Sequence, residues 1–327
     1  MIGSDQALLV TGGTGLLGAH VLRALDAHDM WERVFVGSRR EPSATSMAFR
    51  KGRHWHLDLG DEIALPIGLD TVMHIAGEKL DVDRMWEINH AGTRRLIDAA
   101  AKAGVQRFVY VSSVGVYGAP KHAGLVDESS PRTPGDIYEK SKDAGETAVR
   151  EMCPRLGMNF VVVQPTNVIS HASGHSYPLL GLISAIKTDR FAFFGAREAW
   201  VNYVHVESAA AAIVFAARSA RDSGTYIANT PARLVDLVGW VADELGVAAP
   251  RRRIPAWLGA SAGVAGSALR RVAGRGMPFD SQRYLELTNT TRYCGDGLAR
   301  ELGFKYPVGI ETGVRRLVNA YREEGRL

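Results

Sequence analysis

A glycine-rich turn near the beginning of the chain constrains the fold more than any other feature of the sequence. Residues 11–18 read Thr-Gly-Gly-Thr-Gly-Leu-Leu-Gly and contain both G-x-x-G-x-x-G and G-x-G-x-x-G. The apolar residues 8–11 lead into this turn, and an amphipathic helical pattern over residues 16–25 follows it. Glycines between a strand and a helix let the backbone approach a pyrophosphate, and the helix N-terminus offers N–H groups to its phosphates. The turn therefore predicts a dinucleotide-binding unit; the alternative is a glycine turn with a structural role only.

The first half of the chain alternates short apolar runs with helical patterns. The strand candidates are residues 8–11, 34–37, 71–75, 108–112 and 160–163, and further helical patterns lie around residues 96–101 and 138–151. Continuous apolar strands that alternate with helices indicate a parallel sheet covered on both faces. We therefore expect a doubly wound α/β (Rossmann) fold. Prolines break the second half into short elements, which predicts a smaller, mixed α/β region there.

Charge and composition narrow the function classes without selecting one. The 327 residues include 39 Lys+Arg and 35 Asp+Glu, a net charge of +4, but six arginines and no acidic residue lie between residues 251 and 275, which leaves −2 for the rest. One local cluster is not the extended basic surface that nucleic acids require. The two cysteines and the histidine spacings predict neither a disulfide framework nor a metal site. The longest nearly uncharged stretch has 16 residues, fewer than the roughly 20 of a membrane span. We therefore expect a cytoplasmic protein.

The residues that follow the second apolar run indicate which dinucleotide is bound. An acidic residue at the end of this strand would accept a hydrogen bond from a ribose 2′-hydroxyl, but Gly37-Ser38-Arg39-Arg40 stands there instead. No carboxylate repels a 2′-phosphate at this position, and two guanidinium groups are available to bind one. The segment favours NADP(H) over NAD(H); the alternative is that Arg39 and Arg40 lie in a solvated loop. Asp58 is a candidate acceptor for the adenine amino group, or a simple turn residue.

A second group of residues consists of candidate catalytic side chains. In Tyr138-Glu139-Lys140-Ser141-Lys142, Tyr138 and Lys142 are four residues apart and lie on one face of the predicted helix. A nearby positive charge favours the phenolate, so we expect Lys142, together with the nicotinamide cation of a bound cofactor, to lower the pKa of Tyr138 from its ordinary value of about 10. Tyr138 could then exchange a proton with a substrate oxygen, and Ser113, after the run 108–112, could hydrogen-bond the same oxygen.

With these motifs in sequence order, the chain resembles the extended short-chain dehydrogenase/reductase superfamily, specifically its NAD(P)-dependent epimerase/dehydratase branch. The resemblance covers nearly the whole chain. The matching segments are the glycine turn, His74-Ile75-Ala76-Gly77, Asn89-His90-Ala91-Gly92-Thr93, residues 111–118, Tyr138 with Lys142, Gln164-Pro165-Thr166-Asn167-Val168, Val204-His205-Val206-Glu207 and Glu301-Leu302-Gly303-Phe304.

The resemblance assigns roles to these positions. It implies that Ser113, Tyr138 and Lys142 are catalytic. The cofactor-binding residues that the motifs and the resemblance together imply are Gly12, Thr14, Gly15, Leu16, Leu17, Gly18, Ser38, Arg39, Arg40, Asp58, Leu59, His74, Ala76, Gly77, Asn89, Val111, Ser112, Tyr138, Lys142, Pro165, Asn167 and Val168. It also implies an NADP-binding domain of residues 1–167 plus about 201–230, a substrate-binding region of residues 168–200 plus 231–327, and a homodimer whose interface includes the Tyr138 helix.

Departures from the family pattern bear on the substrate. Gln164 stands where an arginine is usual, and Val201 stands where many nucleotide-sugar enzymes have a diphosphate-binding arginine. The segment from Ser281 through Tyr293 to Gly303 looks more like 3β-hydroxysteroid-dehydrogenase-like and dihydroflavonol-reductase-like members. Dehydratases usually carry an Asp-Glu pair beside the serine, whereas Val114 and Gly115 stand here, so dehydration is not expected.

Three hypotheses follow. The leading one is an NADP(H)-dependent oxidoreductase that interconverts a small-molecule ketone and a secondary alcohol; NAD(H) remains a possible cofactor. The second is a nucleotide-sugar epimerase or reductase of the same family, and the third is a cofactor-sensing protein without turnover. The basic segment 251–275 is expected either to attract an anionic or amphipathic substrate, to touch a membrane surface, or to form solvated ends of a packed apolar helix.

Overall fold

The computed structural model describes residues 6–27, 31–41, 52–118, 124–171, 179–195, 199–220, 222–273 and 279–327, with the backbone alone over 269–273. These residues include a seven-stranded sheet of order β12-β7-β5-β4-β1-β2-β3. Its strands are β1 (Ala7–Thr11), β2 (Arg33–Ser38), β3 (Gly52–His56), β4 (Thr71–His74), β5 (Arg107–Val111), β7 (Asn159–Pro165) and β12 (Gly224–Ala228). All neighbouring strands in it are parallel, which confirms the doubly wound α/β class.

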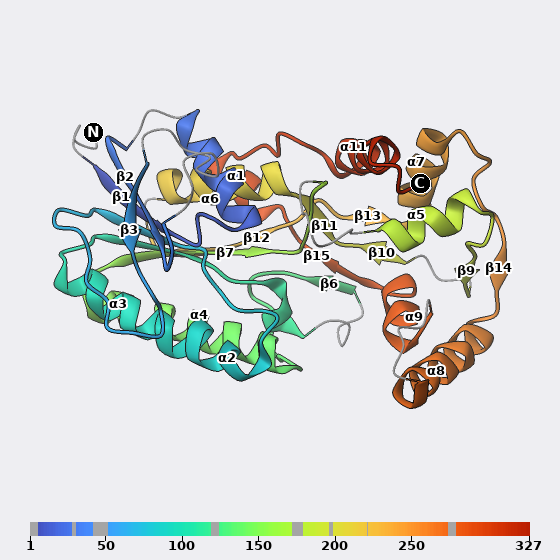
Figure 1. Ribbon diagram of the computed structural model, residues 1–327, viewed down its shortest axis with the longest axis horizontal. Helices are drawn as coiled ribbons and strands as arrows, with labels where there is room; N and C mark the ends of the chain where they lie inside the picture. The colour runs from blue at the N-terminus through green and yellow to red at the C-terminus, as the bar shows by residue number, and fades with distance from the viewer. Residues whose placement is uncertain are drawn as a thin grey trace.

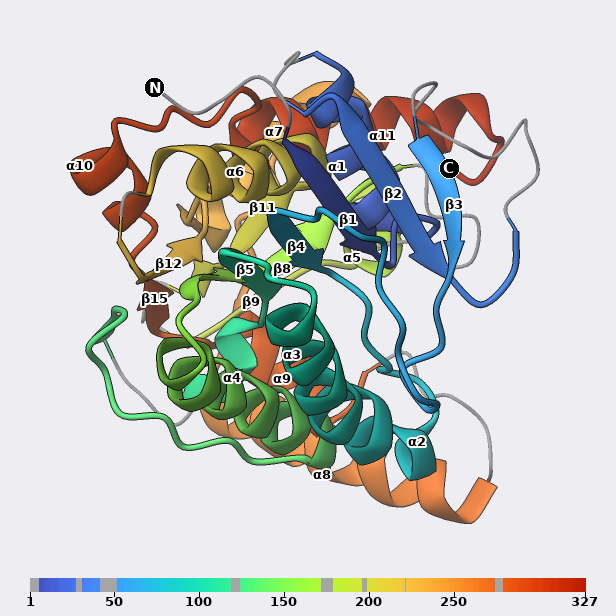
Figure 2. The same ribbon diagram turned by 90° about the vertical axis from the view of Figure 1, so that its left-hand side faces the viewer.

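Helices cover both faces of this sheet (Figures 1 and 2). On one face, α1 (Leu16–Asp26) and α6 (Val206–Ser219) pack with side chains such as Leu8, Val10 and Val109. On the other, α3 (Thr93–Lys102) and α4 (Ile137–Arg155) pack with the alternate side chains, among them Leu9, Phe108 and Tyr110. The central strands are apolar on both sides because both sides are buried.

The order of the strands places the site. From β1 the chain builds outward through β2 to β3, and then returns to add β4 on the other side of β1. The direction of winding therefore reverses between β1 and β4, and ligands of open parallel sheets bind beyond the carboxyl ends of the strands at such a reversal. The glycine turn follows β1 directly, and residues 75–78 follow β4.

Most elements outside the sheet and its covering helices form a smaller mixed region beyond that edge, on the right in Figure 1. Its core joins α5 (Leu180–Lys187), α7 (Leu234–Leu245) and α11 (Ile310–Glu323), while α8 (Ala256–Ala273) and α9 (Ser281–Leu287) lie at its periphery. Its short strand pairs are β8 (Asn167–Ile169) with β11 (Tyr203–His205), β9 (Phe193–Phe194) with β14 (Arg253–Ile254), β10 (Trp200–Val201) with β13 (Ala232–Arg233), and β6 (Gly124–Val126) with β15 (Thr291–Tyr293). The two-part division by residue number stays a prediction.

Three elements differ from the sequence expectation. Strands β3 and β12 were not predicted, and both lie at edges of the sheet, where a strand needs less apolar sequence. The helix before α3 is wound as a π-helix, η1 (Glu87–Gly92), which follows the short helix α2 (Val82–Trp86). The remaining short helices are η2 (Val114–Tyr117) and α10 (Gly297–Leu302). Within the described part of the chain, no helix combines the length and the apolar character needed to cross a bilayer.

Helix α4 approaches the sheet closely because it carries a glycine at the contact. A Cβ added to Gly145 would lie 2.4 Å from the Asn89 carbonyl oxygen and 2.5 Å from the Tyr110 hydroxyl oxygen. Real Cβ atoms do not approach so closely, so any larger residue must move α4 away from η1 and β5. The position of the catalytic candidates on α4 therefore depends on this glycine.

We predict that Gly145→Ala lowers the free energy of unfolding by about 1–3 kcal/mol, the usual cost of overpacking a core contact. Gly239→Ala in α7 is the matched control, since nothing lies within 4 Å of the added Cβ. Alanine is a better helix former than glycine, so this control should raise stability by about 0.5–1 kcal/mol. Urea denaturation of both variants measures the two effects; equal stability changes would contradict the close-packing argument.

Candidate cofactor and catalytic site

The glycines of the first turn have different structural roles. Gly12 has a φ of +72°, and a Cβ there would lie 2.6 Å from the Ala76 nitrogen. A Cβ on Gly18 would lie 2.1 Å from the Gly12 carbonyl oxygen, so this glycine allows α1 to pack against the turn. Gly15 caps α1, and a Cβ there would meet only the Gly12 oxygen, at 3.3 Å. No acidic residue stands in the first turn of α1. The open helix N-terminus therefore suits a phosphate.

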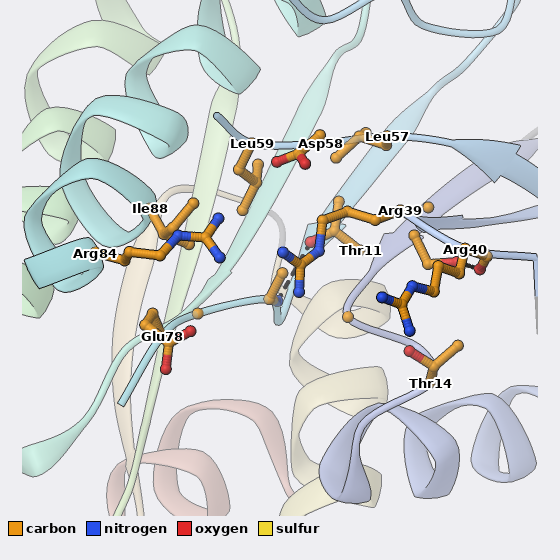
Figure 3. Close-up of a pocket in the computed structure, with 15 residues that line it drawn as sticks. Thr11, Thr14, Arg39, Arg40, Leu57, Asp58, Leu59, Glu78, Arg84 and Ile88 are labelled. Atoms are coloured by element: carbon orange, nitrogen blue, oxygen red, sulfur yellow. Dashed lines mark hydrogen bonds between the residues drawn. The ribbon is translucent and has the colours of Figure 1, made fainter. Parts of the chain in front are cut away.

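A cavity of about 390 Å³ opens beside this turn (Figure 3). It is lined by the glycine turn, the end of β2, the segment after β3, the segment after β4, and α2 with η1. Nine of the expected cofactor residues line it: Gly12, Thr14, Ser38, Arg39, Arg40, Asp58, Leu59, Ala76 and Gly77. The structure thus brings these nine residues together around one cavity, and their contact with a cofactor stays a prediction.

The sequence analysis missed Arg84. This residue of α2 lines the cavity from the side opposite the end of β2, and Figure 3 shows the guanidinium groups of Arg39 and Arg84 turned toward each other across the space. Arg40 lies nearer to Thr14. Three guanidinium groups thus surround the part of the cavity that follows β2. No spacing rule connects position 84 with position 39, so only a structure could bring them together.

Two carboxylates also line the cavity, and one oxygen of each accepts hydrogen bonds from backbone N–H groups. Asp58 accepts a hydrogen bond from the Gly60 nitrogen at 2.9 Å. Glu78 accepts from the nitrogens of Lys79, Leu80 and Asp81 at 2.9–3.1 Å. These backbone hydrogen bonds, that of Leu80 first, hold the pKa of Glu78 below its ordinary value. Both carboxylates stabilise loops, and the lowered pKa keeps Glu78 negatively charged at neutral pH, opposite the positive charge of Arg84.

His74 lies behind the cavity wall rather than in it. Its ring is fully buried. Nδ1 lies 2.7 Å from the Thr11 hydroxyl oxygen, and Nε2 lies 3.0 Å from the Thr93 hydroxyl oxygen. The Thr93 hydroxyl donates to the Asn89 carbonyl oxygen at 2.8 Å, so it must accept from Nε2–H, and Nδ1 must accept from Thr11. His74 is therefore a neutral Nε2–H tautomer that positions the glycine turn, and the expected contact with the cofactor stays a prediction.

Asn89 connects the cavity wall to the catalytic helix. Its side chain accepts from the Glu78 nitrogen at 2.7 Å and donates to the Glu78 carbonyl oxygen at 2.7 Å. The same amide nitrogen donates to the Ser141 hydroxyl at 2.9 Å, and Ser141 donates in turn to the Tyr138 carbonyl oxygen. Asn89 is buried to 1% exposure. It is therefore another positioning residue among those expected to bind the cofactor.

The three catalytic candidates meet at the carboxyl end of β5. Asp136 and Glu139 form a capping box that begins α4 immediately before Tyr138. Ser113 follows β5, and its side chain forms a hydrogen bond with that of Tyr138. One turn later, the buried Lys142 ammonium donates to the Val111 carbonyl oxygen at 2.7 Å and lies 4.3 Å from the centre of the Tyr110 ring. The structure thus brings together residues that the sequence separates by up to 29 positions.

Burial dominates the electrostatics of this group. It lowers the pKa of Lys142 from 10.5 to about 7, against the opposing effect of the Glu146 carboxylate. Burial and the Asp136 carboxylate raise the pKa of Tyr138, and the hydrogen bond with Ser113 lowers it only in part. Among the protein's own groups, desolvation of the phenol outweighs its polar neighbours; the expected lowering, which also counts the charge of a nicotinamide cation, stays a prediction. Tyr138 holds its proton at neutral pH.

A buried network surrounds Gln164, at the position where the family usually has arginine. Its amide donates to the fully buried Glu146 carboxylate at 3.0 Å and accepts from the Tyr117 hydroxyl at 2.8 Å. Arg150 and Arg132 balance the charge of Glu146, with nitrogen–oxygen distances of 2.8 and 3.3 Å. Gln164 therefore links β7 to α4, and both the oxygen and the nitrogen of its amide are engaged in these hydrogen bonds.

The remaining expected cofactor residues lie along the strand ends and the first turn of α1. Gly15, Leu16, Leu17 and Gly18 form the start of that helix. Pro165 ends β7, Asn167 is exposed, and Val168 is half-buried beside it. Ser112 is 5% exposed, and its hydroxyl finds no hydrogen-bond partner in the described part of the structure. A buried hydroxyl without a partner is unusual and suits an atom that pairs with a bound group.

The comparisons with known proteins agree with this architecture. Residues 8–228 match the model of the NAD dependent epimerase/dehydratase family. Over 327 aligned positions the chain is 26% identical to an N-acetyl-alpha-D-glucosaminyl-diphospho-ditrans,octacis-undecaprenol 4-epimerase of Escherichia coli O157:H7, covering 96% of this chain and 94% of that protein. It is 23% identical to 3beta-hydroxysteroid-dehydrogenase/decarboxylase isoform 1 of Arabidopsis thaliana, covering 97% and 80%.

Two further matches show less, because one covers only part of the relative and the other has low sequence identity. A shorter match, 32% identical, pairs 51% of the chain with 42% of the uncharacterized protein y4nG of Sinorhizobium fredii, so the chain spans less than half of that relative. The crystal structure of UDP-glucuronic acid 4-epimerase from Bacillus cereus in complex with NAD superposes with a TM-score of 0.70 at 15% identity, covering 98% of this chain and 99% of that one. At this identity the structural likeness shows the fold.

The buried histidine leads to a prediction about acid stability. Burial, with the Lys142 charge, lowers the pKa of His74 from 6.5 to about 3. In the unfolded chain this histidine therefore binds a proton below about pH 6.5, whereas in the folded protein it binds one only below about pH 3. The free energy of unfolding therefore decreases as the pH is lowered from about 6.5 to about 3. His74→Gln does not titrate, so its stability deficit relative to the unchanged protein should shrink as pH falls. Urea denaturation at several pH values tests this; a pH-independent deficit would contradict it.

Proposed function

Because the chain belongs to the NAD dependent epimerase/dehydratase family, we propose that it is an NADP(H)-dependent oxidoreductase that interconverts a small-molecule ketone and a secondary alcohol by hydride transfer. The observation that carries this proposal is the meeting of Ser113, Tyr138 and Lys142 at the end of β5, beside a cavity that follows the glycine turn. Each of these groups has a defined task in such a reaction.

The cavity residues suit a dinucleotide. The Gly15 position leaves room for a pyrophosphate at the N-terminus of α1, and Asp58 and Leu59 line the part of the cavity where an adenine is expected. Arg39, Arg40 and Arg84 favour a 2′-phosphate, because three guanidinium groups and no carboxylate at the end of β2 make that region positive. NADP(H) is therefore the proposed cofactor, in preference to NAD(H).

The proposed mechanism assigns the proton to Tyr138. When bound, the reduced nicotinamide supplies a hydride to the carbonyl carbon. The Tyr138 hydroxyl donates its proton to the carbonyl oxygen, and the Ser113 hydroxyl holds that oxygen by a hydrogen bond. The Lys142 ammonium stabilises the phenolate that remains. Because burial keeps Tyr138 protonated at neutral pH, ketone reduction is favoured there, and alcohol oxidation, which needs the phenolate, should accelerate as the pH rises.

Two residues distinguish this proposal from the nucleotide-sugar reaction. Val201 is 8% exposed and packs in the core of the second region, and Gln164 is engaged by Glu146 and Tyr117. Neither side chain supplies the positive charge that a sugar diphosphate needs. This supports a ketone or alcohol substrate. The homodimer and the cytoplasmic location suggested by the sequence stay predictions.

Epimerisation is the second candidate, and one observation favours it. The match to the undecaprenol-linked sugar 4-epimerase extends over 94% of that protein. An epimerase oxidises and re-reduces its substrate on a retained cofactor, so it needs no added coenzyme. Turnover by the protein as purified, without added coenzyme, would favour epimerisation; turnover that depends on added NADPH or NADP⁺, across a panel of ketones, steroids and keto-sugar nucleotides, would favour the oxidoreductase.

Tyr138→Phe should lower kcat by at least roughly a hundredfold, because it removes the group that supplies the proton. Binding of NADPH, followed by fluorescence, should not change. Tyr226→Phe, in β12 at the far edge of the sheet, is the matched control and should leave kcat unchanged. Retained turnover in the Tyr138 variant would overturn the assignment.

Arg39→Gln and Arg84→Gln should each raise the KM for NADPH by roughly tenfold to a hundredfold, the loss expected for one charged hydrogen bond to phosphate. The KM for NADH should change little, since NADH lacks the 2′-phosphate. Arg300→Gln, which removes an exposed arginine paired with Glu301 at 3.4 Å, serves as the charge control. If the unchanged protein prefers NADH, the role assigned to Arg39 is wrong.

A further inference from the structure

Helix α8 turns its apolar side chains outward. Trp257, Leu258 and Val264 are 68%, 42% and 64% exposed. They share one face with Ser261, Ala265 and Ala268, which are also exposed, since positions 257, 258, 261, 264, 265 and 268 recur every three to four residues. A helix on the surface of a soluble domain normally shows charged and polar residues to solvent. This face carries a single serine and no charge.

The opposite face of α8 is made of glycines and is closely packed. Gly259, Gly263 and Gly266 are buried. A Cβ on Gly259 would lie 2.4 Å from the Phe194 ring, and a Cβ on Gly266 would lie 2.1 Å from the Phe279 carbonyl oxygen. Only this face of the helix can approach its neighbours so closely. The rotation of α8 is therefore determined by packing, and the exposure of its apolar face follows from that packing.

Arginines precede this apolar face. Arg251, Arg252 and Arg253 are all exposed and lead directly into α8. The Arg252 guanidinium lies 3.7 Å from Asp189, and Arg253 donates to the Gly195 carbonyl oxygen at 3.2 Å. No charged residue occurs from position 254 to 269. The other arginines of the basic segment, at positions 270, 271 and 275, lie outside the described side chains.

We propose that α8, together with Arg251, Arg252 and Arg253, is an interfacial surface that binds the protein to an anionic lipid bilayer. An exposed apolar face with aromatic and aliphatic side chains inserts at the boundary of headgroups and acyl chains. Adjacent arginines add attraction to anionic headgroups. The helix lies in the plane of the membrane surface, with its glycine face toward the protein. This binding does not require the proposed reaction, so each can fail without the other.

Charge distinguishes α8 from the other exposed apolar group at the same edge. Figures 1 and 2 both place α2 and α8 at the lower edge of the molecule. Leu80, Val82 and Trp86, in and before α2, are 84%, 57% and 47% exposed. Three exposed carboxylates, at positions 81, 83 and 87, and two exposed cations, Lys79 and Arg84, accompany them. The exposed charges around α2 are therefore net negative, whereas those at positions 251–253, which lead into α8, are all positive. Charge complementarity with an anionic surface therefore favours α8.

Vesicle flotation tests the proposal with the full-length protein. The protein should float with vesicles of equal parts phosphatidylcholine and phosphatidylglycerol, and should bind pure phosphatidylcholine much more weakly. The double variant Trp257→Gln/Leu258→Gln should lose roughly tenfold or more of this binding, because it removes the inserted apolar side chains. Each arginine near an anionic surface strengthens binding about fivefold, so R251Q/R252Q/R253Q should weaken it roughly a hundredfold.

Matched controls separate α8 from general surface hydrophobicity. Trp86→Gln changes an exposed tryptophan beside carboxylates, and Leu156→Gln changes a leucine whose 42% exposure equals that of Leu258. Both controls should float like the unchanged protein. Circular dichroism melting should show that all variants remain folded, since the substituted side chains are exposed.

Three outcomes would overturn the proposal. The first is failure of the unchanged protein to float with the anionic vesicles. The second is equal flotation of the unchanged protein, the Trp257→Gln/Leu258→Gln variant and the R251Q/R252Q/R253Q variant. The third is a dimer, seen by sedimentation without vesicles, that dissociates in the Trp257→Gln/Leu258→Gln variant, because a second copy of the chain would then be what covers this face.

Discussion

A buried chain of hydrogen bonds underlies the whole site. It runs from the Thr11 hydroxyl through the neutral His74 ring to Thr93 and the Asn89 backbone, and the Asn89 side chain continues it to Glu78 and Ser141. The glycine turn, the wall of the cavity and the catalytic helix are thereby held in one arrangement. The Asn89 amide nitrogen donates to both the Glu78 carbonyl oxygen and the Ser141 hydroxyl, so one buried side chain joins the cavity wall to the catalytic helix. Side chains that never reach the cavity thus determine its shape.

Burial then sets the chemistry of the groups that this arrangement positions. The Lys142 amino group donates a hydrogen bond to the Val111 carbonyl oxygen in an interior that lowers the pKa of Lys142 to about 7, while Tyr138 remains protonated. The charge of Glu146, one turn further along α4, is shared by Arg150, Arg132 and Gln164. The helix therefore holds two buried ionisable groups, Lys142 with a hydrogen bond to a carbonyl oxygen and Glu146 with two arginines and an amide, and these partners offset part of the cost of burying them close to an apolar core.

The prediction from sequence succeeded where the signal was local. The apolar runs at β1, β4, β5 and β7 were correct because strands buried on both faces have to be apolar. The edge strands β3 and β12 were missed because their sequences do not have to be apolar. Arg84 was missed because it reaches the cavity from a helix with no sequence relation to the end of β2. The burial that raises the pKa of Tyr138 in the protein was not foreseen, because neighbours along a helix can be counted from the sequence, whereas desolvation cannot.

By itself, the sequence determined the strand, turn and helix that begin the fold, the four-residue spacing of Tyr138 and Lys142, and the lack of a carboxylate after the second strand. These features depend on backbone geometry over a few residues, and that geometry is encoded by glycines, apolar runs and helical spacing. Only the tertiary structure decided that His74 supports the turn from behind, that Arg39 and Arg84 face each other, and that α8 shows its apolar side to solvent. Those outcomes depend on which distant segments pack together and what each contact buries, and residue spacing carries no measure of either.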